Sequence, residues 1–305
     1  MVSCNQWTNK TDKQIRDEFQ AINLEYQNIK TDLKPGYYHC CLFLPNLNIA
    51  FANDQEDAAL IYTIDGNCID SISTESPFAI TSIDDKTIAV TGGTSCVISF
   101  INVSSNSVVK TIKTEYACWG ITYFDGFLYY VEESKCIMTL NLSNDNQNIL
   151  KIKETMYGSH HRCNLTSNEN RLCYTFKESS TVYVFTINPD RESAKYEYRM
   201  HDPEVLKEMG QCTMDEDRHI YVISQELCQL VAVSAGYFSL HPISSYNYRR
   251  LLSEDDGLFF PNAVDYNRKT NQLLVVNSMT SYDKPCPNFM IFKNRKGESE
   301  DDQKL

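Results

Sequence analysis

Two adjacent histidines, His160 and His161, followed closely by Cys163, form the local cluster most capable of metal chemistry. Imidazole nitrogens and thiolate sulfurs are ligands for zinc and related metals. Adjacent side chains in an extended segment point to opposite sides, so the two imidazoles rarely reach one ion. Residues 156–162 also fall between two repeats of the sequence, which favours hydrogen bonding within a loop over metal binding.

Three signatures of catalysis are missing from the sequence. No Cys-x-x-Cys pair supplies the spacing of a zinc finger, a RING or a B-box. No Gly-x-Ser-x-Gly turn presents a nucleophilic serine. Gly92-Gly93 is not followed by the Lys-Ser/Thr of a phosphate-binding loop. We therefore predict no catalytic residue and no cofactor, and we favour a protein without enzymatic activity.

A repeat organises the chain around these residues. A short strand-like phrase recurs at Asn48–Phe51, Thr87–Val90, Phe127–Tyr130, Arg171–Tyr174, His219–Val222 and Gln272–Val275. Measured from the second residue of each phrase, the spacings are 39, 40, 44, 48 and 53 residues. A period of about 40 to 50 residues filled with short strands is typical of a β-propeller with one four-stranded blade per repeat. The repeats therefore predict an all-β, six-bladed β-propeller over residues 37–293.

Residues 1–36 have a different pattern. Between Thr11 and Leu33, apolar residues are spaced alternately by four and three, at Ile15, Phe19, Ile22, Tyr26, Ile29 and Leu33, and Leu24 is the one apolar residue off this seam. This heptad spacing predicts an amphipathic helix, which would either form a homodimeric coiled coil or lie on the propeller. A competing expectation comes from the sixth repeat, which lacks an outer strand because residues 294–305 form a charged tail that we predict to be disordered. Closing the ring would then require a strand from within residues 29–38.

Charge and composition limit the partners. The chain has 28 Lys and Arg against 40 Asp and Glu, a formal net charge of −12. An acidic surface repels phosphate backbones, so nucleic-acid binding is disfavoured. No apolar run of about 18 residues predicts a membrane span. Twelve Cys without a signal-peptide pattern favour a reduced, cytoplasmic protein over a secreted, disulfide-bonded one.

Longer phrases carry a family resemblance. The stretch around residues 78–132, with the phrases PFAITSIDDKTIAVT and ACWGITYFDGFLYYVEE, resembles the propeller of invertebrate tripartite-motif-like (TRIM-like) proteins. So do residues 251–277, LLSEDDGLFFPNAVDYNRKTNQLLVVN. The resemblance covers about residues 40–300 and implies a six-bladed, NHL-repeat (TolB-like) propeller that holds protein partners. Because the RING and B-box are missing, it does not imply ubiquitin-ligase activity.

Two alternative functions follow from other propellers. Phe260-Pro261-Asn262 resembles the Pro-Asn step of gluconolactonase-type hydrolases, in which an Asn near the channel helps to bind a divalent cation. Such a site needs several converging oxygens, and His39-Cys40-Cys41-Leu42 lacks the Glu of that family. Asn262 is thus a weak metal candidate, with a turn or strand-end role as the alternative. RNA binding, implied for some NHL propellers, is disfavoured by the charge.

We expect a non-enzymatic interaction scaffold that holds a protein partner on one loop face of the propeller. Aromatic and arginine side chains dominate such interfaces. The expected partner-binding residues are Tyr116, Trp119, His160, His161, Arg162, Phe260 and Tyr282. For Trp119 the alternative is a packed core aromatic.

Overall fold

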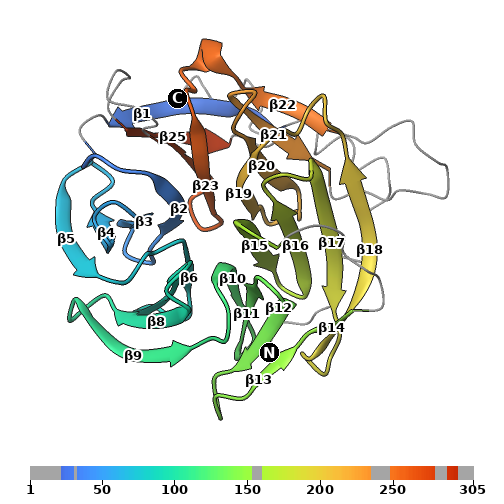
Figure 1. Cartoon of the computed structure of the whole chain (residues 1–305). Coiled ribbons are helices and arrows are strands. Elements are labelled where there is room, and N and C mark those ends of the chain that lie inside the picture. The colour runs from blue at the N-terminus through green and yellow to red at the C-terminus, as the bar shows by residue number, and fades with distance from the viewer. Residues whose placement is uncertain (1–21, 31–32, 153–159, 235–247, 279–286, 295–305) are drawn as a thin grey trace.

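Six β-sheets surround a common axis in the computed structural model, forming the predicted six-bladed β-propeller (Figure 1). The structure describes residues 22–30, 33–152, 160–234, 248–278 and 287–294. The blades follow one another around the ring in chain order. Each blade is numbered below, and its strands are given from the axis outward.

Blades 1 to 3 have four antiparallel strands each. Blade 1 consists of β2 (Tyr38–Phe43), β3 (Ile49–Asn53), β4 (Ala58–Tyr62) and β5 (Cys68–Ser73). Blade 2 consists of β6 (Ala79–Ser82), β7 (Thr87–Thr91), β8 (Val97–Asn102) and β9 (Ser107–Lys113). Blade 3 consists of β10 (Cys118–Phe124), β11 (Phe127–Glu132), β12 (Cys136–Asn141) and β13 (Gln147–Ile149).

Blades 4 to 6 follow the same plan with additions. Blade 4 consists of β15 (Cys163–Asn168), β16 (Arg171–Phe176), β17 (Thr181–Ile187) and β18 (Ser193–His201), with the short β14 (Lys151–Ile152) pairing in parallel at its outer edge. Blade 5 consists of β19 (Met209–Met214), β20 (Ile220–Ser224), β21 (Gln229–Val233) and β22 (Tyr248–Leu252). Blade 6 consists of β23 (Pro261–Asn267), β24 (Gln272–Asn277), β25 (Asn288–Asn294) and β1 (Leu24–Lys30).

Burial explains the repeated apolar phrases. The second and third strands of a blade are covered by neighbouring blades on both faces, and every residue of β3, β4, β20 and β21 is buried. Strands covered on both faces are apolar almost continuously rather than alternately. The outer strand β9, by contrast, has one buried residue among seven. The core is therefore a set of sandwich-like layers between blades.

The ring closes through the strand β1. Leu24–Lys30 pairs antiparallel with β25, from Leu24 opposite Asn294 to Lys30 opposite Phe289. The predicted closure by a strand from the other end of the chain is present, but the strand starts earlier than the expected residues 29–38. The helix that we predicted over residues 1–36 is therefore wrong for residues 24–30. Residues 1–21 lie outside the described residues, as do 295–305 of the predicted tail.

Of the heptad side chains that the structure describes, two belong to the propeller core. Ile22 is 1% exposed in a cluster with residues of blades 5 and 6. Leu33 is buried against blades 1 and 6. Tyr26, by contrast, is 49% exposed and touches Phe292 edge-on. An isolated helix of three heptads is marginal in water, whereas the strand satisfies its backbone groups on β25 and accompanies the burial of Ile22. The predicted dimer through this segment thus loses two of its seam residues to the propeller core.

Side chains join the innermost strands around the axis. Gln211 of β19 accepts the N–H groups of Cys41 (2.9 Å) and Val264 (3.1 Å) at Oε1, and its Nε2 donates to the Cys41 carbonyl (3.0 Å). One side chain of blade 5 therefore bonds to blades 6 and 1. Gly210 allows this approach, because a Cβ at that position would lie 2.4 Å from the Asn262 carbonyl oxygen.

The structure also bears on disulfide bonds and on membrane-spanning helices. All ten described cysteines are free thiols. Within the described ranges, no helix has the length and apolar character needed to cross a membrane.

Candidate functional site

Two sets of loops share one face of the propeller, which we call the upper face. The first set leads from the outer strand of one blade to the innermost strand of the next, and the second joins the second and third strands within a blade. The opposite face, called the lower face, carries the turns between first and second strands.

A depression of about 700 Å³, called the upper recess, lies on this face. Its walls come from blades 1, 4, 5 and 6 and from the loops between them. They include aromatic, cationic and acidic side chains: Tyr37, His39, Asp54, Arg162, Lys177, Glu208, Gln225, Glu226, Cys228, Glu254 and Phe260. Arg162 and Phe260 were predicted for this face, and the structure brings both into the same recess.

A row of five rings, called the aromatic arc, continues from the recess across blades 1 to 4. Successive ring centroids are 4.7 Å apart for Tyr37 and His39, and 4.8 Å apart for His39 and Phe78. The row continues with 5.0 Å from Phe78 to Trp119 and 4.6 Å from Trp119 to His161. These spacings are typical of favourable aromatic packing. Each ring lies at or just before the start of an innermost strand, so the propeller repeat itself places them side by side.

The loops of the recess are held in unusual backbone conformations. Arg162, Glu208 and Phe260 each directly precede an innermost strand, and each has a left-handed φ, of 49°, 44° and 45°. A bulky residue adopts this conformation only when its surroundings enforce it.

Polar residues that end the second strands provide this enforcement in blades 5 and 6. The buried Ser224 accepts the Lys207 N–H (2.9 Å), next to Glu208. The buried Asn277 accepts the Phe259 N–H (3.1 Å), next to Phe260. The recess is thus preorganised by the strands beneath it.

The electrostatics of the recess centre on His39. Its Nε2 lies 3.0 Å from Asp54 Oδ2. Burial lowers the pKa of His39, Asp54 acts in the opposite direction, and the charges of Arg162 and Lys177 lower the pKa further. Burial acts to raise the pKa of Asp54, but His39 and Arg162 outweigh it, so that this pKa is lowered. His39 is therefore mainly neutral near pH 7, beside an ionised Asp54.

Arg162 is the cation of the recess that is available to a partner. Lys177 already pairs with Glu208 (3.4 Å). Arg162 is exposed and has no ion pair with any described residue. Arginine is enriched at interface hot spots because its planar guanidinium binds carboxylates and stacks on rings.

His160 lies beneath the surface rather than in the recess. Its Nδ1 is 2.7 Å from the Tyr174 hydroxyl, and its Nε2 is 3.0 Å from Cys136 Sγ. The Tyr174 hydroxyl in turn donates to Cys163 Sγ (3.0 Å). Burial lowers the pKa of His160 and raises those of the two thiols, which favours neutral groups joined by hydrogen bonds. The contacts of His160 therefore fit the alternative of hydrogen bonding within the loop.

The remaining predicted residues have other positions. Trp119 is 3% exposed, as the core alternative requires, although its indole N–H has no hydrogen-bond partner among the described residues. His161 is half-buried, with Nδ1 3.6 Å from Glu133. Tyr116 is exposed on the upper face under Lys135 (5.5 Å), but it does not line the recess. Tyr282 lies outside the described residues.

Asn262 bridges blades rather than facing a set of carboxylates. Its Nδ2 donates to the Tyr38 carbonyl (2.7 Å), and its Oδ1 accepts from Gln225 (3.4 Å). Among the described residues, the one group of three potential metal ligands that lie close together is Asp215, Asp217 and His219. That group is in a lower-face turn, where Asp215 accepts the His219 N–H (2.9 Å) and the Tyr221 hydroxyl (2.9 Å). The strand-end alternative for Asn262 fits these contacts.

Sequence reasoning missed several residues of the recess, and a signal for them was present. Asp54, Lys177 and Gln225 each directly follow the second strand of their blade. Their positions follow the repeated phrase at a fixed distance, so a residue-by-residue superposition of the repeats would have placed them on one rim. His39 was missed because only the structure shows that the first innermost strand starts at Tyr38 and brings His39 to the rim.

Comparisons with known proteins support the fold. No protein-family model matches the sequence, and no curated protein matches it. The solved RRP9 WD40 repeats match with a TM-score of 0.63 and 12% identity over 90% of this chain and 100% of theirs. A Bacteroides thetaiotaomicron protein of unknown function gives 0.64 at 10% identity, over 88% of this chain and 73% of that one. The Cps50 (Swd1) β-propeller domain of Myceliophteria thermophila gives 0.62 at 8% identity, over 89% and 99%. Similarity at this identity establishes a propeller fold and leaves the function to the site.

Proposed function

We propose that this propeller is a non-enzymatic scaffold that holds a protein partner on its upper face. The observation that carries the proposal is the aromatic arc ending beside Arg162, an exposed cation without a described ion pair. A partner that binds there would cover Tyr37 and His161, the two half-buried rings of the arc, and would supply an acceptor to the Arg162 guanidinium. These are the two contributions that dominate protein–protein hot spots.

The expected partner segment carries an acidic or other acceptor side chain. It would bond to Arg162, the exposed cation of the recess. Asp54, Glu226 and Glu254 form an acidic rim around the recess. This rim would repel a partner segment with many acidic residues and would favour basic residues on either side of the one acceptor side chain. Interface charges of this kind affect specificity and association rate more than affinity.

We further propose that the chain acts as the partner-recognition propeller of a TRIM-like, NHL-repeat protein. The phrases in residues 78–132 and 251–277 support this, as does their position in the blades that build the arc and the recess. A cytoplasmic location is supported by the ten free thiols, since disulfides persist in oxidising compartments.

Affinity capture from native cytosol tests the proposal when two charge reversals are compared. Arg162→Glu changes the upper face, and Lys86→Glu makes the same change at an exposed lower-face turn that follows β6. We expect Arg162→Glu to lower the yield of specific partners about tenfold or more, and Lys86→Glu to leave it unchanged. Equal capture by both variants, with native unfolding curves, would reject the upper face as the binding surface.

A further inference from the structure

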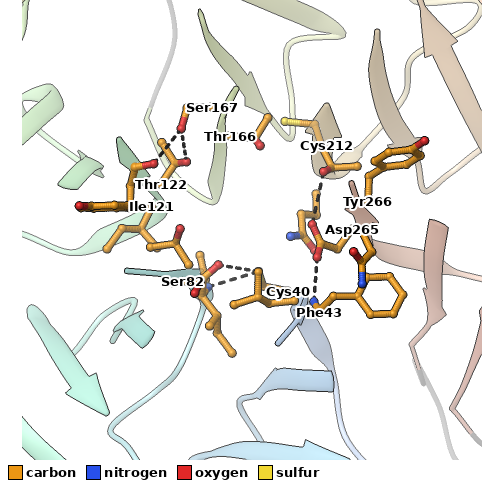
Figure 2. Close-up of a pocket in the computed structure, with 18 of the residues that line it drawn as sticks. Cys40, Phe43, Ser82, Ile121, Thr122, Thr166, Ser167, Cys212, Asp265 and Tyr266 are labelled. Carbon is orange, nitrogen blue, oxygen red and sulfur yellow. Dashed lines mark hydrogen bonds between the residues drawn. The ribbon is translucent and has the colours of Figure 1, made fainter. Parts of the chain in front are cut away.

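The lower face contains a second space, called the lower cavity, which is partly open to solvent and lies at the opposite end of the axis (Figure 2). Its volume is about 380 Å³, within the range of small-molecule binding sites. Gln211, Cys212 and Thr213 of β19 line the lower cavity, whereas Met209, at the upper end of the same strand, lines a separate small space on the upper side. Gln211, which bonds to Cys41 and Val264, is thus part of the floor of the lower cavity.

One register position of the propeller supplies the wall of this cavity. In each blade, one residue of the innermost strand lies opposite the third residue of the repeated phrase. The six positions are Leu42, Thr81, Thr122, Thr166, Thr213 and Asp265. All six line the lower cavity. The repeat therefore builds a ring of four threonines, one carboxylate and one leucine, which we call the threonine ring.

Two hydroxyls of the ring are available to a ligand. Thr122 already shares a hydrogen bond with Ser167 (2.7 Å), and Thr213 donates weakly to Asp265 (3.4 Å). Thr81 and Thr166 have no side-chain hydrogen bond to any described residue and are partly exposed to the cavity. Figure 2 shows the Thr166 hydroxyl directed towards the interior of the space.

Asp265 is the only carboxylate among the described residues that line the cavity, and Arg268 and Lys269 are the cations of the same lining. The Oδ2 of Asp265 accepts the Phe43 N–H (2.8 Å), which fixes its orientation. Burial raises the pKa of Asp265, and the backbone bond and the Arg268 charge oppose this rise. No described cation lies within ion-pair distance of Asp265. The Arg268 guanidinium instead donates to the carbonyls of Ser167 (3.1 Å) and Met214 (3.4 Å).

We propose that the lower cavity binds a small hydroxylated ammonium compound. The ammonium group would lie on Asp265, and the ligand hydroxyls would bond to the free hydroxyls of the threonine ring. A buried carboxylate gains most from a cation that donates hydrogen bonds, because neither group then remains desolvated without a partner. The walls of Ile80, Ile121 and Leu165 would cover the apolar carbon skeleton of the ligand. This site does not depend on the function proposed for the upper face.

Calorimetric titration with glucosamine and glucose tests the proposal on the whole chain. The two probes have the same ring and differ in one ammonium group that replaces a hydroxyl. We expect glucosamine to bind with a dissociation constant below about 10 mM and glucose to bind about tenfold more weakly or not at all. Equal affinity for both sugars, or no heat from glucosamine up to about 50 mM, would overturn the proposal.

Two variants assign the binding to the cavity. Asp265→Asn removes the charge and retains an acceptor for the Phe43 N–H, so that the fold is preserved. It should weaken glucosamine binding about tenfold and leave any glucose binding unchanged. Thr166→Val keeps the side-chain volume and breaks no described hydrogen bond, so it reports on the ring even if the Asp265 variant unfolds. It should weaken both sugars about threefold or more. Unchanged glucosamine affinity in Thr166→Val would place the ligand elsewhere and reject the site.

Discussion

The closure of the ring can be tested at two residues that a coiled coil would treat alike. Ile22 and Tyr26 both belong to the heptad seam read from the sequence. In the propeller they differ, since Ile22 is 1% exposed in the core of blades 5 and 6 and Tyr26 is 49% exposed. Alanine at each position therefore distinguishes a closing strand from a helical seam.

The expected magnitudes follow from burial. Removing three methyl or methylene carbons from a buried isoleucine costs about 2 to 5 kcal/mol, which includes the cavity left behind. A half-exposed tyrosine with one edge-on ring contact should cost about 1 kcal/mol or less. Because a domain is stable by about 5 to 15 kcal/mol in total, the Ile22→Ala change should be obvious.

Urea unfolding at two protein concentrations measures both effects. We expect Ile22→Ala to lower the midpoint strongly, Tyr26→Ala to lower it slightly, and neither midpoint to depend on concentration. A helical seam predicts the reverse pattern: similar losses at the two positions, with midpoints that rise with protein concentration. Such a result would refute closure by β1.

Three further predictions concern the Gln211 hydrogen bonds at the axis, the pH response of His160 and the binding of nucleic acid. Gln211→Leu removes three hydrogen bonds to Cys41 and Val264 and should cost about 2 to 4 kcal/mol in urea unfolding, whereas a loss below about 0.5 kcal/mol would show that water replaces them. Burial lowers the pKa of His160, so the unfolded chain takes up a proton at higher pH than the folded chain does. The free energy of unfolding should therefore fall as the pH drops below about 6.5. Unfolding curves at about pH 7 and 5.5 should show a smaller fall for His160→Gln than for the unchanged chain. Single-stranded RNA should give no salt-sensitive complex in titrations at two salt concentrations, because the net charge is −12; a complex that weakens with salt would contradict this.

The sequence predicts the architecture well because the repeat is periodic. Each phrase such as Thr87–Val90 is a strand covered by its neighbours, and that covering determines its composition. The N-terminal segment was misread for a physical reason. Its spacing of four and three fits a helix, but its partner is β25, about 260 to 270 residues away, and local patterns do not report such pairing.

The candidate site was predictable in part. Arg162 and Phe260 were found because their residue types stand out in loops between repeats. His39 and Lys177 were missed because their importance comes from convergence in space around one recess. Asp265 was also missed, since an isolated carboxylate in a strand gives no signal until the register places it beside four threonines.

Hydrogen–deuterium exchange on the propeller with its captured partner tests the central claim most directly. We predict protection on the upper face, at residues 160–163 and 254–261, together with unchanged exchange in the lower-face turns at residues 44–48 and 83–86. The amides of these turns provide an internal control within the same molecule. Protection confined to the lower-face turns, or to the outer strand β9, would contradict the assignment of the upper face as the partner-binding surface.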